Sequence, residues 1–203
     1  MKRLITALFF VFVLHNAVAE NDLNTALKLH VNKDYPAAFE IFKELANRGN
    51  ASAQANIGYY YDNGYAVEQN SEEAVRWYRR AAENGSVFAQ YNLGIMYEIG
   101  EGVARDYGTA YMWFYTAAEG GDREAAVYLG LFNEEGLGRR VDKVRAFAWY
   151  SVAAERHELY GAQKRDAIAR VLNENELMQA RALTAKLLHD LGDIKDRGNE
   201  TRI

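Results

Sequence analysis

Residues 89–97 read AQYNLGIMY, residues 100–106 read GEGVARD, and residues 110–119 read AYMWFYTAAE. These stretches are the clearest copy of a pattern that occurs three times in the middle of the chain, with a period of 36 residues. Its markers are Gly58, Gly94 and Gly130; Gly64, Gly100 and Gly136; Ala74, Ala110 and Ala146; and Trp77, Trp113 and Trp149. A period of this length is typical of stacked supersecondary units, so the pattern predicts a solenoid with an extended binding surface rather than an enclosed catalytic pocket.

Each copy has the pattern helix, loop, helix. In the middle copy, apolar residues fall three and four positions apart over 89–97 and again over 110–118, which indicates two amphipathic helices. Gly94 lies inside the first of these helices, where glycine costs about 1 kcal/mol relative to alanine. We therefore expect a close contact with the second helix, whose small pair Ala117–Ala118 would let the two backbones approach.

Three further local predictions follow from the alignment of the copies. Polar residues at the loop ends predict N-caps at Asn70, Asp106 and Asp142, with Glu73 completing a capping box in the first copy. The tryptophans recur in every copy, which favours a packing role over a binding role. The third copy has Asn133 and Arg139 where the others have tyrosine and valine, which predicts a less firmly packed loop.

At these residues the chain resembles the Sel-one-like repeats (SLR), a subfamily of the tetratricopeptide-repeat superfamily. The resemblance covers residues 49–156 and implies an all-α fold, a right-handed α-solenoid of stacked antiparallel helix pairs. It predicts a degenerate N-terminal repeat over 20–48, SLR repeats over 49–84, 85–120 and 121–156, a capping helix pair over 157–191 and a polar tail over 192–203.

The first nineteen residues are predicted to be a signal peptide. Lys2 and Arg3 precede an apolar run over 4–14, and residues 17–19 read AVA, which is typical of a cleavage site before Glu20. A transmembrane helix is the alternative, but it needs about 20 apolar residues. We therefore expect an exported protein, most simply a periplasmic one, although secretion from the cell is also open, without stable membrane insertion after cleavage.

Composition narrows the range of partners and cofactors. Loss of Lys2 and Arg3 takes the formal net charge from −4 to −6, and no Lys/Arg stripe stands out, so nucleic acid is a poor partner. The chain has no cysteine, which excludes disulfides, thiolate metal sites and a bacterial lipid anchor. The four histidines are scattered and common catalytic motifs are missing, so we expect no catalytic residue, no metal and no cofactor.

The fold that the chain resembles implies a concave groove lined by the first helix of each repeat. Carried over to this sequence, the groove has an apolar floor and an acidic rim, and it suits a peptide or protein segment with apolar or aromatic anchors beside Lys or Arg. The predicted groove residues are Ser52, Tyr59, Asp62, Phe88, Tyr91, Ile95, Glu98, Glu124, Val127, Leu131 and Glu134. They vary between copies while the scaffold does not.

Two classes of function follow. The first is an exported adaptor or scaffold for protein–protein interaction through this groove. The alternative is a cell-envelope protein that binds or processes peptidoglycan or another glycan, with Glu98 and Glu134 as candidate carboxylates.

Overall fold

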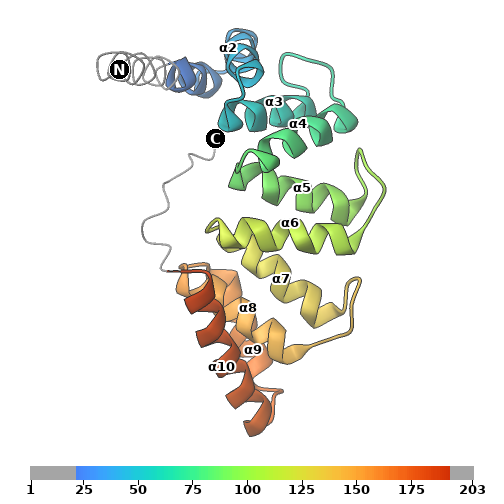
Figure 1. Ribbon diagram of the computed structural model, residues 1–203, viewed down its shortest axis with the longest axis vertical. Coiled ribbons are helices and arrows are strands. Elements are labelled where there is room, and N and C mark those ends of the chain that lie inside the picture. Colours follow the sequence, from blue (N-terminus) through green and yellow to red (C-terminus); the bar gives the residue numbers. More distant parts are fainter. Residues whose placement is uncertain (1–21, 193–203) are drawn as a thin grey trace, which may run out of the picture. The chain divides into compact units, whose positions relative to one another are not determined.

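The computed structural model describes residues 22–192, and every regular element within them is a helix (Figure 1). The predicted signal peptide and most of the polar tail lie outside this range. The helices cover residues 22–31, α2 Tyr35–Asn47, α3 Ala51–Asn63, α4 Ser71–Glu83, α5 Val87–Ile99, α6 Tyr107–Glu119, α7 Arg123–Glu135, α8 Lys143–Glu155, α9 Leu159–Ala169 and α10 Glu174–Asp190. None of the helices in residues 22–192 has the length and apolar character needed to cross a membrane.

The described chain divides into two compact units, one up to Ser86 and one from Val87 onward. In the first unit α2 packs on α3 and α3 on α4. In the second unit each helix from α5 to α9 packs on the next, and α10 returns to α8. Each unit has its own buried core, so the prediction of an all-α fold made of successive packed helices is confirmed.

The glycine inside the first helix of each pair faces an aromatic ring of the second helix. A Cβ atom on Gly94 would lie 2.7 Å from the Phe114 ring, closer than carbon atoms approach in proteins. Gly58 meets Tyr78 and Gly130 meets Tyr150 in the same way. The predicted close contact is confirmed, but its partner is the aromatic residue after each tryptophan and not the alanine pair.

The same contact changes the expected role of the tryptophans. Tyr78, Phe114 and Tyr150 are completely buried. Of the tryptophans, only Trp149 is in the core, at 3% exposed, whereas Trp77 and Trp113 are half-buried. The core position in each pair belongs to the ring that packs against the glycine of the first helix.

The three predicted N-caps form, at Asn70, Asp106 and Asp142. The predicted capping box at Glu73 does not. Asn70 accepts a hydrogen bond from the Glu73 backbone N–H, but its own N–H donates to the Tyr61 carbonyl at 2.9 Å. With that donor taken, the Glu73 carboxylate pairs with Arg76 instead.

The loop of the third copy is held by the two residues that depart from the pattern. Asn133 is 1% exposed, and its side-chain amide donates to the Leu129 carbonyl. Its oxygen accepts a hydrogen bond from Arg139 at 3.3 Å, and the Arg139 guanidinium lies 3.4 Å from the centre of the Tyr111 ring. The prediction of a loosely packed loop is therefore wrong, because the two departures from the pattern compensate for each other.

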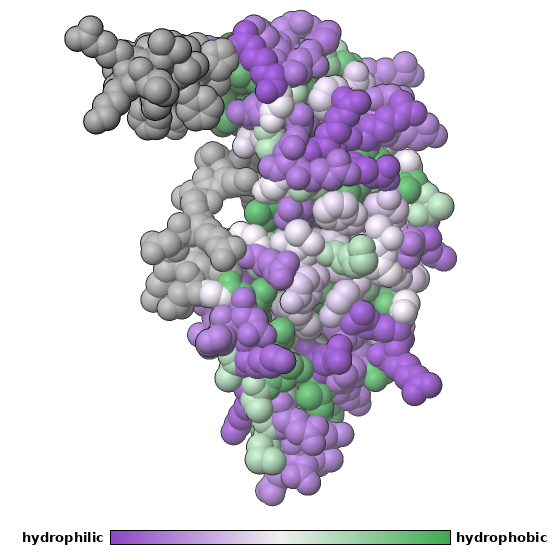
Figure 2. Space-filling model, viewed as in Figure 1, coloured by the Kyte–Doolittle hydropathy of each residue, from purple (hydrophilic) through white to green (hydrophobic). Residues whose placement is uncertain are grey.

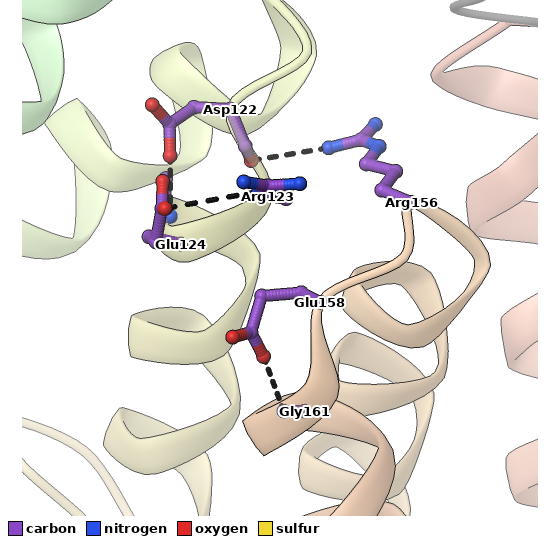
Figure 3. Close-up of polar contacts among 7 residues, drawn as sticks. Asp122, Arg123, Glu124, Arg156, Glu158 and Gly161 are labelled. Carbon is purple, nitrogen blue, oxygen red and sulfur yellow. Dashed lines mark hydrogen bonds and ion pairs between the residues drawn. The ribbon is translucent and has the colours of Figure 1, made fainter.

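Arg156 forms hydrogen bonds with the end of α6 and the start of α7 in the second unit. This residue caps α8, and its guanidinium donates to the carbonyls of Ala118 and Asp122 at 2.9 and 3.3 Å, the second bond being drawn in Figure 3. Burial lowers the pKa of Arg156 to about 10, with an opposing effect of Asp122, so the side chain stays charged at neutral pH. It adds a charged donor to carbonyls on both sides of the turn between α6 and α7.

The first copy uses a glutamine where the third copy uses Arg156. In the first copy the Gln54 side chain donates to the carbonyl of Ala46, at the end of the preceding helix, at 3.1 Å. The third copy has Ala126 at the position of Gln54, and Ala118 at the position of Ala46. Arg156 therefore reaches the carbonyl that has lost its glutamine.

The last two helices complete the second unit. Asn173 and Glu176 form a capping box at the start of α10, each side chain accepting from the backbone N–H of the other.

On the face drawn in Figure 2, polar side chains predominate over the first unit, whereas over α9 and α10 they alternate with apolar ones. Leu159, Val171 and Met178 are the most exposed apolar side chains of this region.

Candidate partner-binding site

In the first unit, the predicted groove residues Ser52, Tyr59 and Asp62 lie on α3, and all three are half-buried. The Ser52 carbonyl accepts a hydrogen bond from Asn56 within the helix. Asp62 accepts a long hydrogen bond, 3.5 Å, from the hydroxyl of Tyr78 on α4. The face thus combines one aromatic ring with one carboxylate.

In the second unit, two helices carry the remaining predicted residues. Phe88, Tyr91, Ile95 and Glu98 lie on α5, and Glu124, Val127, Leu131 and Glu134 lie on α7. All are half-buried except Val127, which is 6% exposed and belongs to the core beneath the face.

Tyr91 and Tyr128 join the two helices of this face. Their rings are 5.8 Å apart in an edge-to-face arrangement, and their hydroxyls are hydrogen-bonded. Burial is the main cause that raises the pKa of both phenols, so both stay neutral. Tyr128 was not among the predicted residues, since its position in the repeat carries no marker.

Three of the predicted carboxylates occupy one position of the repeat. Asp62, Glu98 and Glu134 stand 36 residues apart, and each comes from the last turn of a first helix. The residue of the second helix that packs on the glycine is Tyr78 in the first copy, Phe114 in the middle copy and Tyr150 in the third. This ring decides what happens to the carboxylate, because only tyrosine has a hydroxyl to donate.

In the third copy the carboxylate is neutralised within the unit. The Tyr150 hydroxyl donates to Glu134 at 2.6 Å, and Lys164 on α9 forms an ion pair with the same oxygen at 2.6 Å. The Lys164 ammonium also lies 5.6 Å from the centre of the Tyr150 ring. Glu134 therefore belongs to the contact between α7 and α9 and contributes no net negative charge to the rim.

In the middle copy the carboxylate has neither of these contacts. Phe114 offers no hydroxyl, so Glu98 lacks the donor that its counterparts have. Burial and the negative charge of Glu135 raise the pKa of Glu98. The arrangement is a half-buried carboxylate beside a second one, with Tyr128 close enough to be affected by its charge. A cationic group placed here would lower the electrostatic cost of both carboxylates.

Phe114 and Glu135 are the members of this arrangement that sequence reasoning missed. The signal was present at Phe114, the only one of the three equivalent rings without a hydroxyl. The importance of the missing hydroxyl could not be recognised from the sequence, because it depends on the packing of this ring beside the carboxylate position of the first helix.

Within residues 22–192, no group of three or more His, Cys, Asp or Glu side chains could hold a metal ion. A surface depression of about 380 Å³ lies between α8, α9 and α10 in the second unit. It is lined by side chains of both charges, among them Glu155, Arg165, Asp166 and Arg181. No predicted site residue faces it.

The repeated glycine–aromatic contact and the successive helix pairs define the class of the protein, an α-solenoid repeat protein. A family model described as Sel1 repeat matches residues 27–50, 51–86, 87–122 and 123–157. The chain therefore belongs to the Sel1 repeat family, which confirms the resemblance seen in its sequence. Proteins of this family are in general scaffolds for protein–protein interaction and are generally non-catalytic.

Two solved structures are similar to this chain. One is c5321, a protective antigen present in uropathogenic Escherichia coli strains and displaying an SLR fold, with 34% identity and a TM-score of 0.70 over 75% of this chain and 32% of that chain. The other is a Sel1 repeat protein from Oxalobacter formigenes, with 32% identity and a TM-score of 0.69 over 80% of this chain and 69% of that one. The chain thus spans about a third of the antigen's length. No curated protein matches it.

Proposed function

We propose that this chain is an exported, periplasmic scaffold that binds a segment of a partner protein on the first-helix faces of its two units. The membership of the Sel1 repeat family supports the class of function. The residues of the faces support the mode, because all of them except Val127 are half-buried and because they combine aromatic rings with carboxylates and differ between copies. Each unit presents its own face.

Glu98 is the observation that carries the proposal. Its counterparts Asp62 and Glu134 receive a tyrosine hydroxyl within their own unit, and Glu134 also has a lysine. Glu98 lacks that hydroxyl because of Phe114, and it lies beside Glu135. A half-buried carboxylate next to another one raises the free energy of the free protein, and a Lys or Arg of a partner relieves that cost on binding.

The apolar part of the same face defines the rest of the partner segment. Tyr91, Ile95 and Leu131 are partly exposed and pack against the core of the second unit, so they are held rigid. Rigid, half-buried aromatic and aliphatic side chains are the usual anchors of an interface, while charges at the rim set orientation. We therefore propose a segment with an apolar or aromatic anchor beside a basic residue.

Affinity capture from envelope extracts tests this proposal. The wild-type protein is expected to retain a partner that Glu98→Gln and the double variant Tyr59→Ala, Tyr91→Ala do not retain. Glu155→Gln, which removes one exposed carboxylate from α8, is the matched control and is expected to behave as wild type. Equal capture by wild type and Glu98→Gln would reject the assignment of this face.

Sedimentation with purified cell-wall sacculi, followed by analysis of the released fragments, tests the alternative function. The scaffold proposal expects neither retention nor cleavage. Retention that depends on Glu98 would favour a protein that binds peptidoglycan, and cleavage would favour one that processes it.

A further inference from the structure

The first unit contains a group of aromatic side chains that the predicted groove does not explain. His30 lies among four tyrosine rings, those of Tyr35, Tyr59, Tyr60 and Tyr65, with ring centres 5.3 to 6.1 Å away. Tyr35 and Tyr65 are stacked, with centres 4.4 Å apart and planes at 19°. We call these five residues the tyrosine cluster.

One side chain of the cluster is buried, and the other four are partly exposed to solvent. Tyr60 is completely buried, and its hydroxyl lies 3.0 Å from Nδ1 of His30. The other four side chains are half-buried. Gly64, with φ of 70°, ends α3 in the left-handed conformation, and the Tyr65 N–H returns to the Tyr60 carbonyl at 3.0 Å. This turn fixes the Tyr65 ring beside Tyr59 and Tyr35.

Stacking of repeats does not require these tyrosines. The positions of Tyr59 and Tyr65 carry Ile95 and Glu101 in the middle copy. In the third copy they carry Leu131 and Leu137. The first position thus accepts aliphatic residues and the second an aliphatic or a charged one, so two neighbouring phenol rings at the end of one helix are a property of this copy alone.

Two carboxylates lie close enough to the cluster to act on its phenols. Asp62 acts on Tyr59, and Asp34 acts on Tyr60. Burial lowers the pKa of His30, so the imidazole is neutral near pH 7 and does not offset the two carboxylates. The hydroxyls of Tyr59 and Tyr65 are hydrogen-bonded, and burial is the main cause that raises the pKa of Tyr59. The cluster therefore combines aromatic rings with nearby carboxylates.

A guanidinium group fits a surface of this kind. Its flat, weakly hydrated cation stacks on aromatic faces, and its fork of donors pairs with a carboxylate. We propose that the tyrosine cluster binds an arginine side chain of a partner segment, with the guanidinium against the Tyr59 and Tyr65 rings and its charge facing Asp62. This inference rests on the proposed scaffold function and assigns the partner chemistry of the first unit.

Titration with synthetic peptides, followed by NMR of the tyrosine ring signals, tests the inference on the protein purified after expression of the full chain. The probe is a short blocked glycine peptide with one central arginine, and the control peptide has citrulline, which keeps the shape and loses the charge. The arginine peptide is expected to cause saturable shifts of the Tyr59 and Tyr65 signals, and the citrulline peptide to bind about tenfold more weakly.

The matched variant is the double change Tyr59→Leu, Tyr65→Leu. It installs the residues that the third copy has at these positions, so the fold is expected to persist, and circular dichroism checks this. This variant and Asp62→Asn are expected to weaken binding of the arginine peptide by about tenfold, whereas Tyr160→Leu, at an exposed tyrosine of the second unit, is expected to leave it unchanged.

Equal binding of the arginine and citrulline peptides, or unchanged binding by the folded double variant, would overturn the inference. Ring shifts caused by a neutral glycan but not by the arginine peptide would also overturn it, in favour of a sugar site. The assay uses no cell extract, so its failure is separable from that of the scaffold proposal. If Glu98→Gln still abolished partner capture, only the tyrosine cluster would be rejected.

Discussion

At the scale of single residues, one position of the repeat shows how a neighbour decides the role of a charge. Asp62, Glu98 and Glu134 are equivalent in sequence, but the ring opposite each one differs in a single hydroxyl. In the third copy, where Tyr150 and Lys164 both contact it, the carboxylate is part of the scaffold. In the middle copy Phe114 donates no hydrogen bond to Glu98. The electrostatic free-energy cost of ionised Glu98 can therefore be relieved by a bound cation.

Glu98→Gln is expected to stabilise the folded protein near neutral pH. Burial and Glu135 raise the pKa of Glu98 above the 4.5 of an unperturbed glutamate, so the folded state disfavours the ionised form more than the unfolded chain does. This cost is fully present above the raised pKa and is lost as the pH falls towards 4.5. Denaturant unfolding at neutral pH and near pH 4.5 should show a stabilisation at the first and little difference at the second.

Glu134→Gln is the matched control for this effect, with the opposite sign. The change removes an ion pair with Lys164 and weakens the bond from Tyr150, so a loss of about 1 kcal/mol is expected at neutral pH. If both variants shifted stability in the same direction, the difference we assign to Phe114 would be wrong.

Gly94→Ala is expected to destabilise the protein by about 1–3 kcal/mol, although alanine is the better helix former. The new Cβ would lie 2.7 Å from the Phe114 ring, which is fully buried and has nowhere to move. Thermal or denaturant unfolding measures the loss. The same change at Gly108, exposed in the first turn of α6, is expected to be neutral or to stabilise by up to about 1 kcal/mol. Equal effects at the two sites would contradict the packing argument.

At the scale of elements, the loop after α7 is expected to behave as a coupled pair. Arg139→Val leaves the buried Asn133 oxygen without its donor and removes the stacking on Tyr111, so a loss of about 1–3 kcal/mol is expected. The double change Asn133→Tyr, Arg139→Val restores the residues of the other two copies and is expected to recover part of that loss. A double-mutant cycle by denaturant unfolding measures the coupling. Additive effects of the two changes would show that the residues act independently.

At the scale of the whole molecule, we expect export to remove the first nineteen residues of the chain. The purified protein from an osmotic-shock fraction is expected to have the mass of a chain that begins at Glu20, because the AVA motif at 17–19 is typical of a cleavage site. Ala19→Phe should block cleavage and leave the precursor at the membrane. Intact-mass spectrometry distinguishes the forms, and a full-length protein found in the cytoplasm would rule out the predicted signal peptide.

Much of the fold could be predicted from the sequence because repetition places the constraint of packing on the same residue types every 36 positions. The glycines, the helix pairs and the N-caps at Asn70, Asp106 and Asp142 were all predicted in this way. The capping box at Glu73 was predicted wrongly, because the backbone N–H of Asn70 that it needs donates to the carbonyl of Tyr61 instead. That contact crosses the loop and cannot be seen in a local sequence motif. The loop at Asn133 was wrongly predicted to pack loosely, because the contacts of Arg139 with Asn133 and Tyr111 likewise depend on the tertiary structure.

The sequence by itself determined the class of protein, since periodic glycine, alanine and aromatic residues can be satisfied only by helix pairs stacked in one way. It also determined which positions vary. The tertiary structure alone decided what those variable positions do, because a charge or a ring acquires its role from the atoms opposite it. Glu98 and the tyrosine cluster around His30 take their roles from contacts made across helices, and such contacts are set by packing rather than by spacing along the chain.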